Sequence, residues 1–221
     1  MTEPDQDVPY SEDLQSPEDA KAWADAADRK RPLRVRIRNA IVERLSALPP
    51  GARVLELGSG PGFLAEQVLS RFTHIANYTM LDFSQPMLDM SRARVQRFAS
   101  ATLVLGDFRS NEWMRNVAPA YDAVVSMQAV HEVRHKRHVP RLYQQVHTLL
   151  ATNGVFLIAD RVPEDDSVRS AALFMTAPEQ VKALDEAGFV DVRVVMSGDA
   201  LVFCECRKPG TTPSTSAATR A

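Results

Sequence analysis

Cysteine is scarce in this sequence: the 221 residues contain two, Cys204 and Cys206. Both lie in an apolar stretch of strand type, where they share one face and would make a poor disulfide staple. We therefore expect a reduced, cytoplasmic setting. A lone C-x-C pair is weak support for a metal site, and we assign no metal ligands to it.

Long hydrophobic runs are also missing, since no apolar stretch approaches the roughly 20 residues that span a bilayer. The first residues, 1–5, lack the basic and apolar regions of a signal peptide. The net charge of −2 gives no bulk attraction for a polyanion, so we do not expect a nucleic-acid or membrane partner. What is present is a 45% hydrophobic composition, which supports the core of one domain.

The two ends of the chain differ in composition from the middle. Residues 1–20 hold seven acidic residues, three prolines and no lysine or arginine, and we expect 1–16 to form a disordered acidic arm. Residues 209–221 are rich in small and polar residues and predict a disordered tail. Between them we expect N-terminal lid helices over 17–48 and a ligand-binding domain over 49–208.

Strand and helix patterns alternate through that middle part, which predicts an α/β fold with a doubly wound parallel sheet. The predicted strands are 53–57, 77–82, 101–105, 121–127 and 153–160. The predicted helices are 17–30, 33–48, 63–72, 85–98, 110–117, 137–150 and 178–187. Two final runs, 189–196 and 200–206, are joined by Ser197-Gly198-Asp199 and predict a closing hairpin.

A glycine-rich turn follows the first of these strands, in the run Val54-Leu55-Glu56-Leu57-Gly58-Ser59-Gly60-Pro61-Gly62. Such a strand–turn–helix unit presents backbone N–H groups, and glycine lets the backbone approach a ligand. Glu56 stands just before the turn, where it could meet an ammonium group. Asp82 ends the next strand, where folds of this kind place a carboxylate that bonds ribose hydroxyls.

The motifs ELGSGPG, LDFSQPML and LGDF resemble the successive cofactor motifs of class I S-adenosylmethionine (SAM) dependent methyltransferases. This resemblance implies a Rossmann-like, seven-stranded, doubly wound sheet of order 3-2-1-4-5-7-6 with an N-terminal helical lid. It implies S-adenosyl-L-methionine as cofactor and a small molecule as methyl acceptor. It also implies in-line displacement, which mainly requires proximity and alignment of the reacting atoms.

The same resemblance implies roles for individual residues at the ends of the strands. The methionyl end of SAM would be held by the turn and by the acid before it, through Glu56, Gly58, Ser59, Gly60 and Gly62. The ribose would bond to Asp82, and the adenine would be bordered by Phe83, Met87, Gly106, Asp107 and Phe108, with Asp107 accepting from its amine. The end of the fourth strand would shape the methionyl pocket through Ser126 and Met127.

The segment His131-Glu132-Val133-Arg134-His135 matches the H-E-x-x-H pattern of zinc peptidases, which needs both histidines on one helix. Here the segment directly follows a strand and carries arginine, whose charge opposes a dication. In the resembling family this loop faces the methyl acceptor, so we expect His131 to be a catalytic base or to position the acceptor. We place Gln128 and Trp23 with it as acceptor contacts.

Alternatives remain at this point. A metal-assisted methyltransferase could use the segment from His131 to His138, and a SAM-binding regulatory or assembly subunit could lack catalysis. A nicotinamide oxidoreductase is disfavoured by the G-x-G-x-G spacing and by the absence of a Tyr-x-x-x-Lys pair.

The acceptor end of the site is less well defined by the sequence. A basic cluster at 30–38 includes Arg34 and Arg38 on one helical face, which indicates either an anionic acceptor or a solvated face opposite Ile37 and Ile41. Seventeen residues separate Asp160 from Pro178, which is short for the acceptor-covering segment that the resemblance implies at this point. The acceptor would then be covered by the N-terminal helices, by a partner chain in a possible homodimer, or by little at all.

Overall fold

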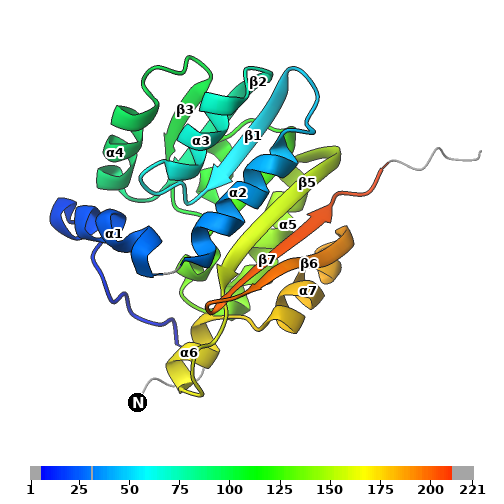
Figure 1. Cartoon of the computed structure of the whole chain (residues 1–221). Helices are drawn as coiled ribbons and strands as arrows, with labels where there is room; N and C mark the ends of the chain where they lie inside the picture. Colours follow the sequence, from blue (N-terminus) through cyan, green and yellow to red (C-terminus); the bar gives the residue numbers. More distant parts are fainter. Residues whose placement is uncertain (1–5, 31, 211–221) are drawn as a thin grey trace, which may run out of the picture.

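In the computed structural model, which describes residues 6–30 and 32–210, a seven-stranded sheet lies between two layers of helices (Figure 1). The strand order is β3-β2-β1-β4-β5-β7-β6. The strands are β1 (Ala52–Leu57), β2 (Ile75–Asp82), β3 (Ala101–Leu105), β4 (Tyr121–Met127), β5 (Leu150–Arg161), β6 (Val190–Gly198) and β7 (Leu201–Arg207). Strand β7 pairs antiparallel with both β5 and β6, whereas the other pairs are parallel. The predicted fold class and strand order are confirmed.

Helices cover both faces of this sheet. The α-helices are α1 (Pro17–Lys30), α2 (Leu33–Leu45), α3 (Phe63–Arg71), α4 (Gln85–Val95), α5 (Val139–Leu149), α6 (Val168–Leu173) and α7 (Ala177–Glu186). Short 3₁₀ turns follow β3 and β4, at η1 (Glu112–Asn116), η2 (Val130–Val133) and η3 (Lys136–His138). Apolar side chains of α2, α3 and α4 pack on one face, and those of α5 and α7 pack on the other.

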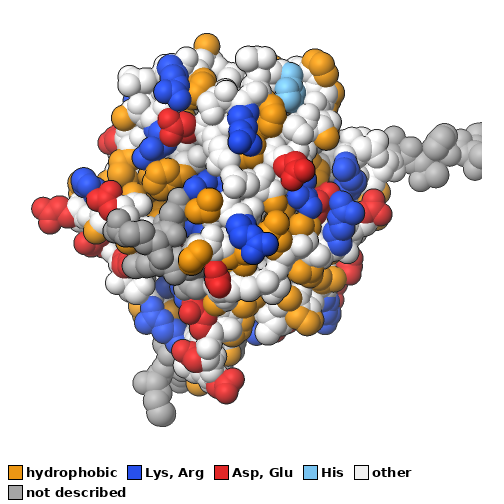
Figure 2. Space-filling model, in the orientation of Figure 1, with side chains coloured by type: hydrophobic (Ala, Val, Ile, Leu, Met, Phe, Trp, Pro, Cys, Tyr) orange, Lys and Arg blue, Asp and Glu red, His pale blue; other side chains and the backbone are white. Residues whose placement is uncertain are grey.

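The strands read as apolar runs because both of their faces are buried. In β1, Val54 packs in the core on the α2 side, whereas Leu55 and Leu57 pack in the core on the α5 side. None of the helices in the described part of the chain is long and apolar enough to cross a membrane. On the face drawn in Figure 2, lysine and arginine side chains are interspersed with acidic and apolar ones.

Two elements differ from the sequence prediction. The helix expected at 110–117 is only the 3₁₀ turn η1, which the buried Trp113 anchors through a bond from its Nε1 to Gln145 Oε1 (3.2 Å). Helix α6 was not predicted, because its six residues are too few to show helical periodicity. Ser167 caps its N-terminus, because the Ser167 side chain accepts a bond from the backbone N–H of Ser170.

The N-terminal arm also differs, since residues 6–16 pack on the body instead of standing free as a disordered arm. Val8 is buried, and its N–H donates to the carbonyl oxygen of Arg134 (2.8 Å). The Tyr10 ring stacks on Phe83 and lies under the Arg134 guanidinium. The predicted disorder of 1–5 and of 211–221 concerns residues outside the described ranges.

The glycine turn after β1 packs tightly on the loop after β4. A Cβ atom added to Gly58, whose φ is +66°, would lie 2.2 Å from the Cβ atom of Ala129. By contrast, Gly51 also has a positive φ (+85°), yet a Cβ atom there would meet nothing within 4 Å. The two positions therefore separate backbone strain from steric overlap.

We expect Gly58→Ala to lower the free energy of unfolding by about 3 kcal/mol, because backbone strain and overpacking add. Gly51→Ala should lower it by only about 1–2 kcal/mol, because strain alone acts there. Urea denaturation of both variants checks this. Equal losses would show that the turn tolerates a methyl group.

Candidate active site

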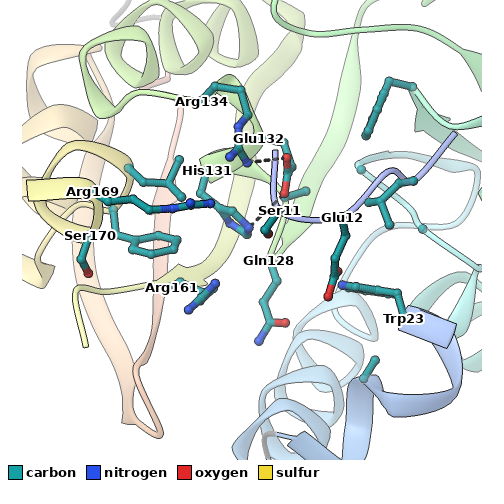
Figure 3. A pocket seen from close by; sticks show the side chains of 18 of the residues that line it. Ser11, Glu12, Trp23, Gln128, His131, Glu132, Arg134, Arg161, Arg169 and Ser170 are labelled. Carbon is teal, nitrogen blue, oxygen red and sulfur yellow. Dashed lines mark hydrogen bonds and ion pairs between the residues drawn. The ribbon is translucent and has the colours of Figure 1, made fainter. Parts of the chain in front are cut away.

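A cavity of about 470 Å³ opens beyond the carboxyl ends of β1, β2, β4 and β5 (Figure 3). Each of these strands contributes wall residues at or just after its end: Gly58, Gly60, Asp82, Phe83, Gln128, His131 and Arg161. Open α/β sheets bind ligands at this edge. The volume lies within the range of small-molecule sites, about 300–1,000 Å³.

The amides of the glycine turn bond within the protein in this structure, whereas the sequence predicted N–H groups that are presented to a ligand. The amides of Gly58 and Ser59 both donate to Leu81 O (2.8 and 3.0 Å), and that of Gly62 donates to Ser59 O (3.1 Å). The Gly60 amide donates to Asp82 Oδ2 (2.7 Å). A Cβ atom on Gly60 would come no nearer than 3.9 Å to another heavy atom, at Trp23, so this glycine leaves room at the wall.

Asp82 lies where the sequence placed it, in the cavity wall at the end of β2. Its carboxylate accepts from the amides of Gly60 and of Ser84 (2.9 Å). Burial raises the pKa of Asp82 to about 6, although these N–H groups oppose the shift. Phe83, Met87 and Phe108 line the same part of the cavity.

Two predicted carboxylates are not brought to the cavity wall. Glu56 lies beneath it on the α2 side, where Tyr78 Oη donates to Glu56 Oε2 (2.9 Å). Burial raises the pKa of Glu56 to about 8, with the Tyr78 bond opposing. Asp107 turns instead to Arg109, whose Nη2 lies 2.5 Å from Asp107 Oδ2. Burial favours a higher pKa for Asp107, but the Arg109 bonds outweigh it and lower the pKa.

Other predicted cofactor residues support the site from behind and do not line the cavity: Ser59, Gly62, Gly106, Ser126 and Met127. Ser126 Oγ donates to Leu57 O (3.1 Å) and so ties β4 to β1. The amide of Gly106 donates to Asp82 O (2.9 Å). These contacts fix the strand ends that carry the wall.

Arg34 is a cavity residue that the sequence left between two interpretations. It is buried, its Nη1 donates to Gln128 Oε1 (2.6 Å), and its guanidinium carbon lies 4.9 Å from the centroid of the Trp23 ring. The solvated-face interpretation was wrong for this residue, because Arg34 shares the buried face of α2 with Ile37 and Ile41. The i, i+3, i+7 spacing of these three residues is the signal that could have shown it.

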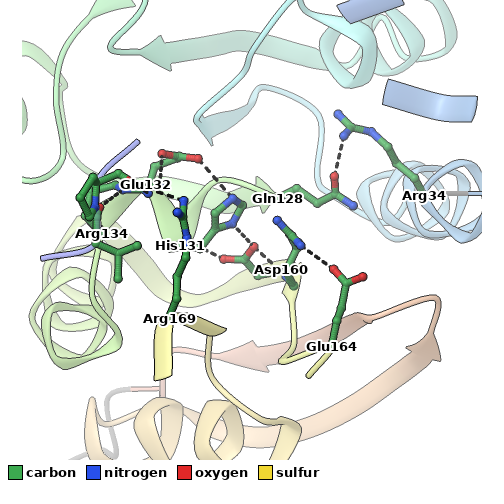
Figure 4. A network of polar contacts seen from close by, with 11 residues as sticks. Arg34, Gln128, His131, Glu132, Arg134, Asp160, Glu164 and Arg169 are labelled. Atoms are coloured by element: carbon green, nitrogen blue, oxygen red, sulfur yellow. Dashed lines mark hydrogen bonds and ion pairs between the residues drawn. The ribbon is translucent and has the colours of Figure 1, made fainter. Parts of the chain in front are cut away.

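His131 lies between two carboxylates (Figure 4). Its Nδ1 is 2.6 Å from Asp160 Oδ1, and its Nε2 is 3.2 Å from Glu132 Oε1. Its backbone N–H also donates to Asp160 Oδ2 (2.7 Å). Burial would lower the pKa of His131, but the charges of Asp160 and Glu132 outweigh it and raise the pKa to about 9. In this arrangement the two carboxylates therefore favour the cationic form of the ring.

The other histidines of this segment have partners of their own. His135 Nδ1 accepts from the Arg137 amide (3.1 Å), and His138 Nε2 lies 2.8 Å from Asp7 Oδ1. The H-E-x-x-H letters do not fall on one helix, because Arg134 ends η2 in the left-handed conformation (φ 67°). In residues 6–30 and 32–210, no group of three or more His, Cys, Asp or Glu side chains is arranged to hold a metal ion.

The cavity is covered by two segments that the sequence did not assign to it. The arm contributes Ser11, Glu12 and Leu14, and the end of β5 with the segment after it contributes Arg161, Glu164, Asp165, Ser167, Arg169, Ser170, Leu173 and Phe174. Arg134 fastens the arm, since its Nε donates to Val8 O (2.9 Å) and its Nη2 to Pro9 O (2.7 Å). Short as it is, the stretch between Asp160 and Pro178 forms a wall of the cavity beside the helix α1 that carries Trp23.

Comparison with known proteins agrees with this geometry. Residues 54–154 match the family described as "Methyltransferase domain". The chain is 41% identical over 91 residues to a malonyl-[acyl-carrier protein] O-methyltransferase of Neorickettsia risticii (strain Illinois), a match that covers 41% of this chain and 33% of that protein. The chain thus spans about a third of that relative.

Solved structures share the fold. The CurJ carbon methyltransferase superposes with a TM-score of 0.67 at 15% identity, over 80% of this chain and 54% of that one. The N-methyltransferase NodS from Bradyrhizobium japonicum WM9, in complex with S-adenosyl-L-homocysteine (SAH), gives a TM-score of 0.63 at 17% identity, over 79% of this chain and 87% of that one. Residues 54–154 of the chain are thus similar to the methyltransferase domain family, and its fold is that of solved SAM-dependent methyltransferases.

We expect the His131 ring to titrate near pH 9, and Glu132→Gln to lower that pKa, because one of the two carboxylates that favour the cation is removed. Histidine NMR titration measures this, with His147, which packs on Phe189 and does not line the cavity, as the internal control. A wild-type ring that titrates near its ordinary value of 6.5 would contradict the ion pairing.

The same shift links stability to pH. Because the folded pKa lies above the unfolded one, the stabilisation is fully present below about pH 6.5 and is lost as the pH rises through about 9. Urea denaturation across this window should show a smaller loss in Glu132→Gln than in the wild type.

Proposed function

We propose that this chain transfers a methyl group from SAM to a small-molecule acceptor that binds beside His131. The supporting observation is one cavity that joins Gly60, Asp82 and Phe83 at one end to Gln128 and His131 at the other. Cofactor and acceptor would thus meet in a shared space, which methyl transfer by displacement requires. The named acceptor of the Neorickettsia relative is carried on a protein, so the proposal includes carrier-bound acyl groups.

The cofactor end fits an adenosyl amino acid. The Asp82 carboxylate would accept from both ribose hydroxyls, and Phe83 with Met87 would border the adenine. Gly60 leaves the space that the cofactor needs at the turn. The guanidinium of Arg34 would bind the amino-acid carboxylate, a task that the internally bonded turn amides do not perform. When bound, SAM supplies a methyl group activated by the positive sulfonium.

At the acceptor end, His131 is the group that can hold or accept a proton. Asp160 holds the ring at Nδ1 and through the backbone, so Nε2 is the atom that faces an acceptor. The Glu132 carboxylate 3.2 Å from Nε2 favours the cation in the present arrangement. An acceptor that separated Glu132 from His131 would lower the pKa of the ring and make Nε2 a base. Asp160 is then a positioning residue.

The cofactor assignment predicts that Asp82→Asn weakens SAH binding by about 10- to 100-fold, because a charged acceptor of hydrogen bonds is lost. Binding to the wild type should also weaken as the pH falls through about 6, where Asp82 takes up a proton. That pH dependence should be absent in Asp82→Asn. Isothermal titration calorimetry measures both effects, with the exposed Asp89→Asn on α4 as control. Unchanged affinity in Asp82→Asn would end the assignment.

The acceptor assignment predicts that His131→Gln lowers turnover by about 100-fold or more, as expected for a lost acid–base group. SAH affinity should stay unchanged. An acceptor for this assay comes from a methyl-transfer screen of metabolites and acyl thioesters read by mass. His138→Gln, in the same segment but bonded to Asp7, is the matched control. Full activity in His131→Gln would remove the residue from the site, and SAM binding without transfer to any compound would favour a regulatory or assembly subunit.

A further inference from the structure

Gln128 and Arg161 each place an unpartnered hydrogen-bond donor in the cavity wall. Gln128 Nε2 and Arg161 Nε are both buried and bond to nothing in residues 6–30 and 32–210. A buried donor left unpaired costs about 1–3 kcal/mol, so folded proteins rarely keep one without a reason. Two of them in one wall indicate a ligand that brings hydrogen-bond acceptors.

The orientation of the Gln128 amide is fixed by its neighbours. Its Oε1 accepts from Arg34 Nη1 at 2.6 Å. Because a guanidinium has donors only, the oxygen and nitrogen of this amide cannot be exchanged. The Gln128 backbone adopts a positive φ of 58°, and its amide donates to Ala159 O (2.7 Å). Strained backbone of this kind persists where the surrounding structure holds it, and it often marks functional sites.

The orientation of the Arg161 guanidinium, at the end of β5, is also fixed by its neighbours. Its Nη2 donates to Glu164 Oε1 (2.5 Å), and its guanidinium carbon lies 4.3 Å from the centroid of the Phe174 ring. The Phe174 ring in turn lies 5.4 Å from the His131 ring, measured between centroids. Stacking fixes the guanidinium plane, and Glu164 occupies one part of its edge, so Nε is left for another partner. Because the Glu164 carboxylate already balances the positive charge of Arg161, the group that bonds to Arg161 Nε need not be charged.

We propose that Gln128 and Arg161 determine acceptor specificity by binding an acyl oxygen, of a carbonyl or a carboxylate, beside His131. The inference deepens the proposed function and rests on it. Figure 3 shows both side chains reaching into the cavity that His131 lines. Acceptors without such an oxygen, for example simple amines, would leave both donors unpaired, and sites built for a hydrogen bond reject such analogues strongly.

The chemistry of an acyl group suits the neighbouring histidine. A carbonyl makes a C–H bond beside it acidic, and a carboxylic acid carries an acidic O–H itself. In either case the acceptor loses a proton, the electron pair left on carbon or oxygen forms the bond to the methyl group, and the bond from methyl to sulfur breaks. The proton goes to His131 Nε2 once the bound acceptor has separated this atom from Glu132 and the ring has become neutral, or it has already gone to water in the case of a carboxylate. Donors at the acyl oxygen stabilise the charge that this leaves on the acceptor.

The test measures binding of three probes to the SAH-loaded protein: malonate, the N-acetylcysteamine thioester of 3-oxobutanoate, and ethanolamine. Arg161→Lys keeps a cation for Glu164 but removes Nε. Gln128→Glu keeps an oxygen for Arg34 but removes the amide donor. Arg92→Lys on the surface of α4 is the matched control for the lysine exchange. We expect each cavity variant to bind the acyl probe about tenfold more weakly than the wild type does. The control should bind that probe as tightly as the wild type.

A second readout reports on the hydrogen bond itself. The Arg161 Nε–H signal in a ¹H–¹⁵N spectrum, assigned by its loss in Arg161→Lys, should shift when the acyl probe is added and stay in place with ethanolamine. A response to malonate alone selects the carboxylate, and a response to the thioester alone selects the carbonyl. Either one supports the proposal.

The outcomes separate this proposal from the one on which it rests. Absence of SAH binding in the wild type would bring down the methyltransferase function itself. If SAH binds, the donor pair is refuted either by acyl probes that fail to bind or by acyl probes that bind both cavity variants as tightly as the wild type. Ethanolamine binding as strong as that of the acyl probes would refute it as well.

Discussion

Parallel pairing of the central strands is the constraint on which the site depends. Residue Met127 pairs with Ala159 across β4 and β5, so the next residues along the two strands, Gln128 and Asp160, emerge side by side. Pairing of Leu57 with Leu81 across β1 and β2 does the same for Gly58 and Asp82. Backbone hydrogen bonds therefore set the distances among these groups before any side chain contributes, and a slip in register would separate them.

At the edge of the sheet where the parallel strands end, burial favours the neutral form of Asp82, whereas nearby carboxylates favour the charged form of His131. Asp82 loses water and finds only backbone amides, so its pKa rises to about 6. His131 also loses water, but it finds two carboxylates and becomes a more stable cation. Arg34 is buried beside them, on a helix whose other buried residues are apolar. The cavity wall thus brings the charged side chains of Arg34, Asp82 and His131 together.

The covering of the cavity is made from segments far apart in the chain. Arg134 extends from the loop after β4 and bonds to carbonyl oxygens of the arm, while Tyr10 of the arm stacks on Phe83 after β2. Helix α6 closes the other side through Arg169, together with Phe174, the residue that follows the helix. An acidic arm and a short connection, neither of which looks structural in the sequence, thereby become parts of one wall.

Local patterns in the sequence, namely apolar periodicity, the glycine turn and strand-end acids, predicted the strands and the Gly60–Asp82 end of the cavity, and the resemblance of the motifs to a known family implied the strand order. The sequence also marked His131. Only the tertiary structure decided that Asp160 and Glu132 hold that ring, that Asp107 turns to Arg109, and that Arg161 and Phe174 lie beside the acceptor end. These contacts join residues from different elements. Their energies come from burial and charge at the meeting point of the strands, which no single segment of the chain contains.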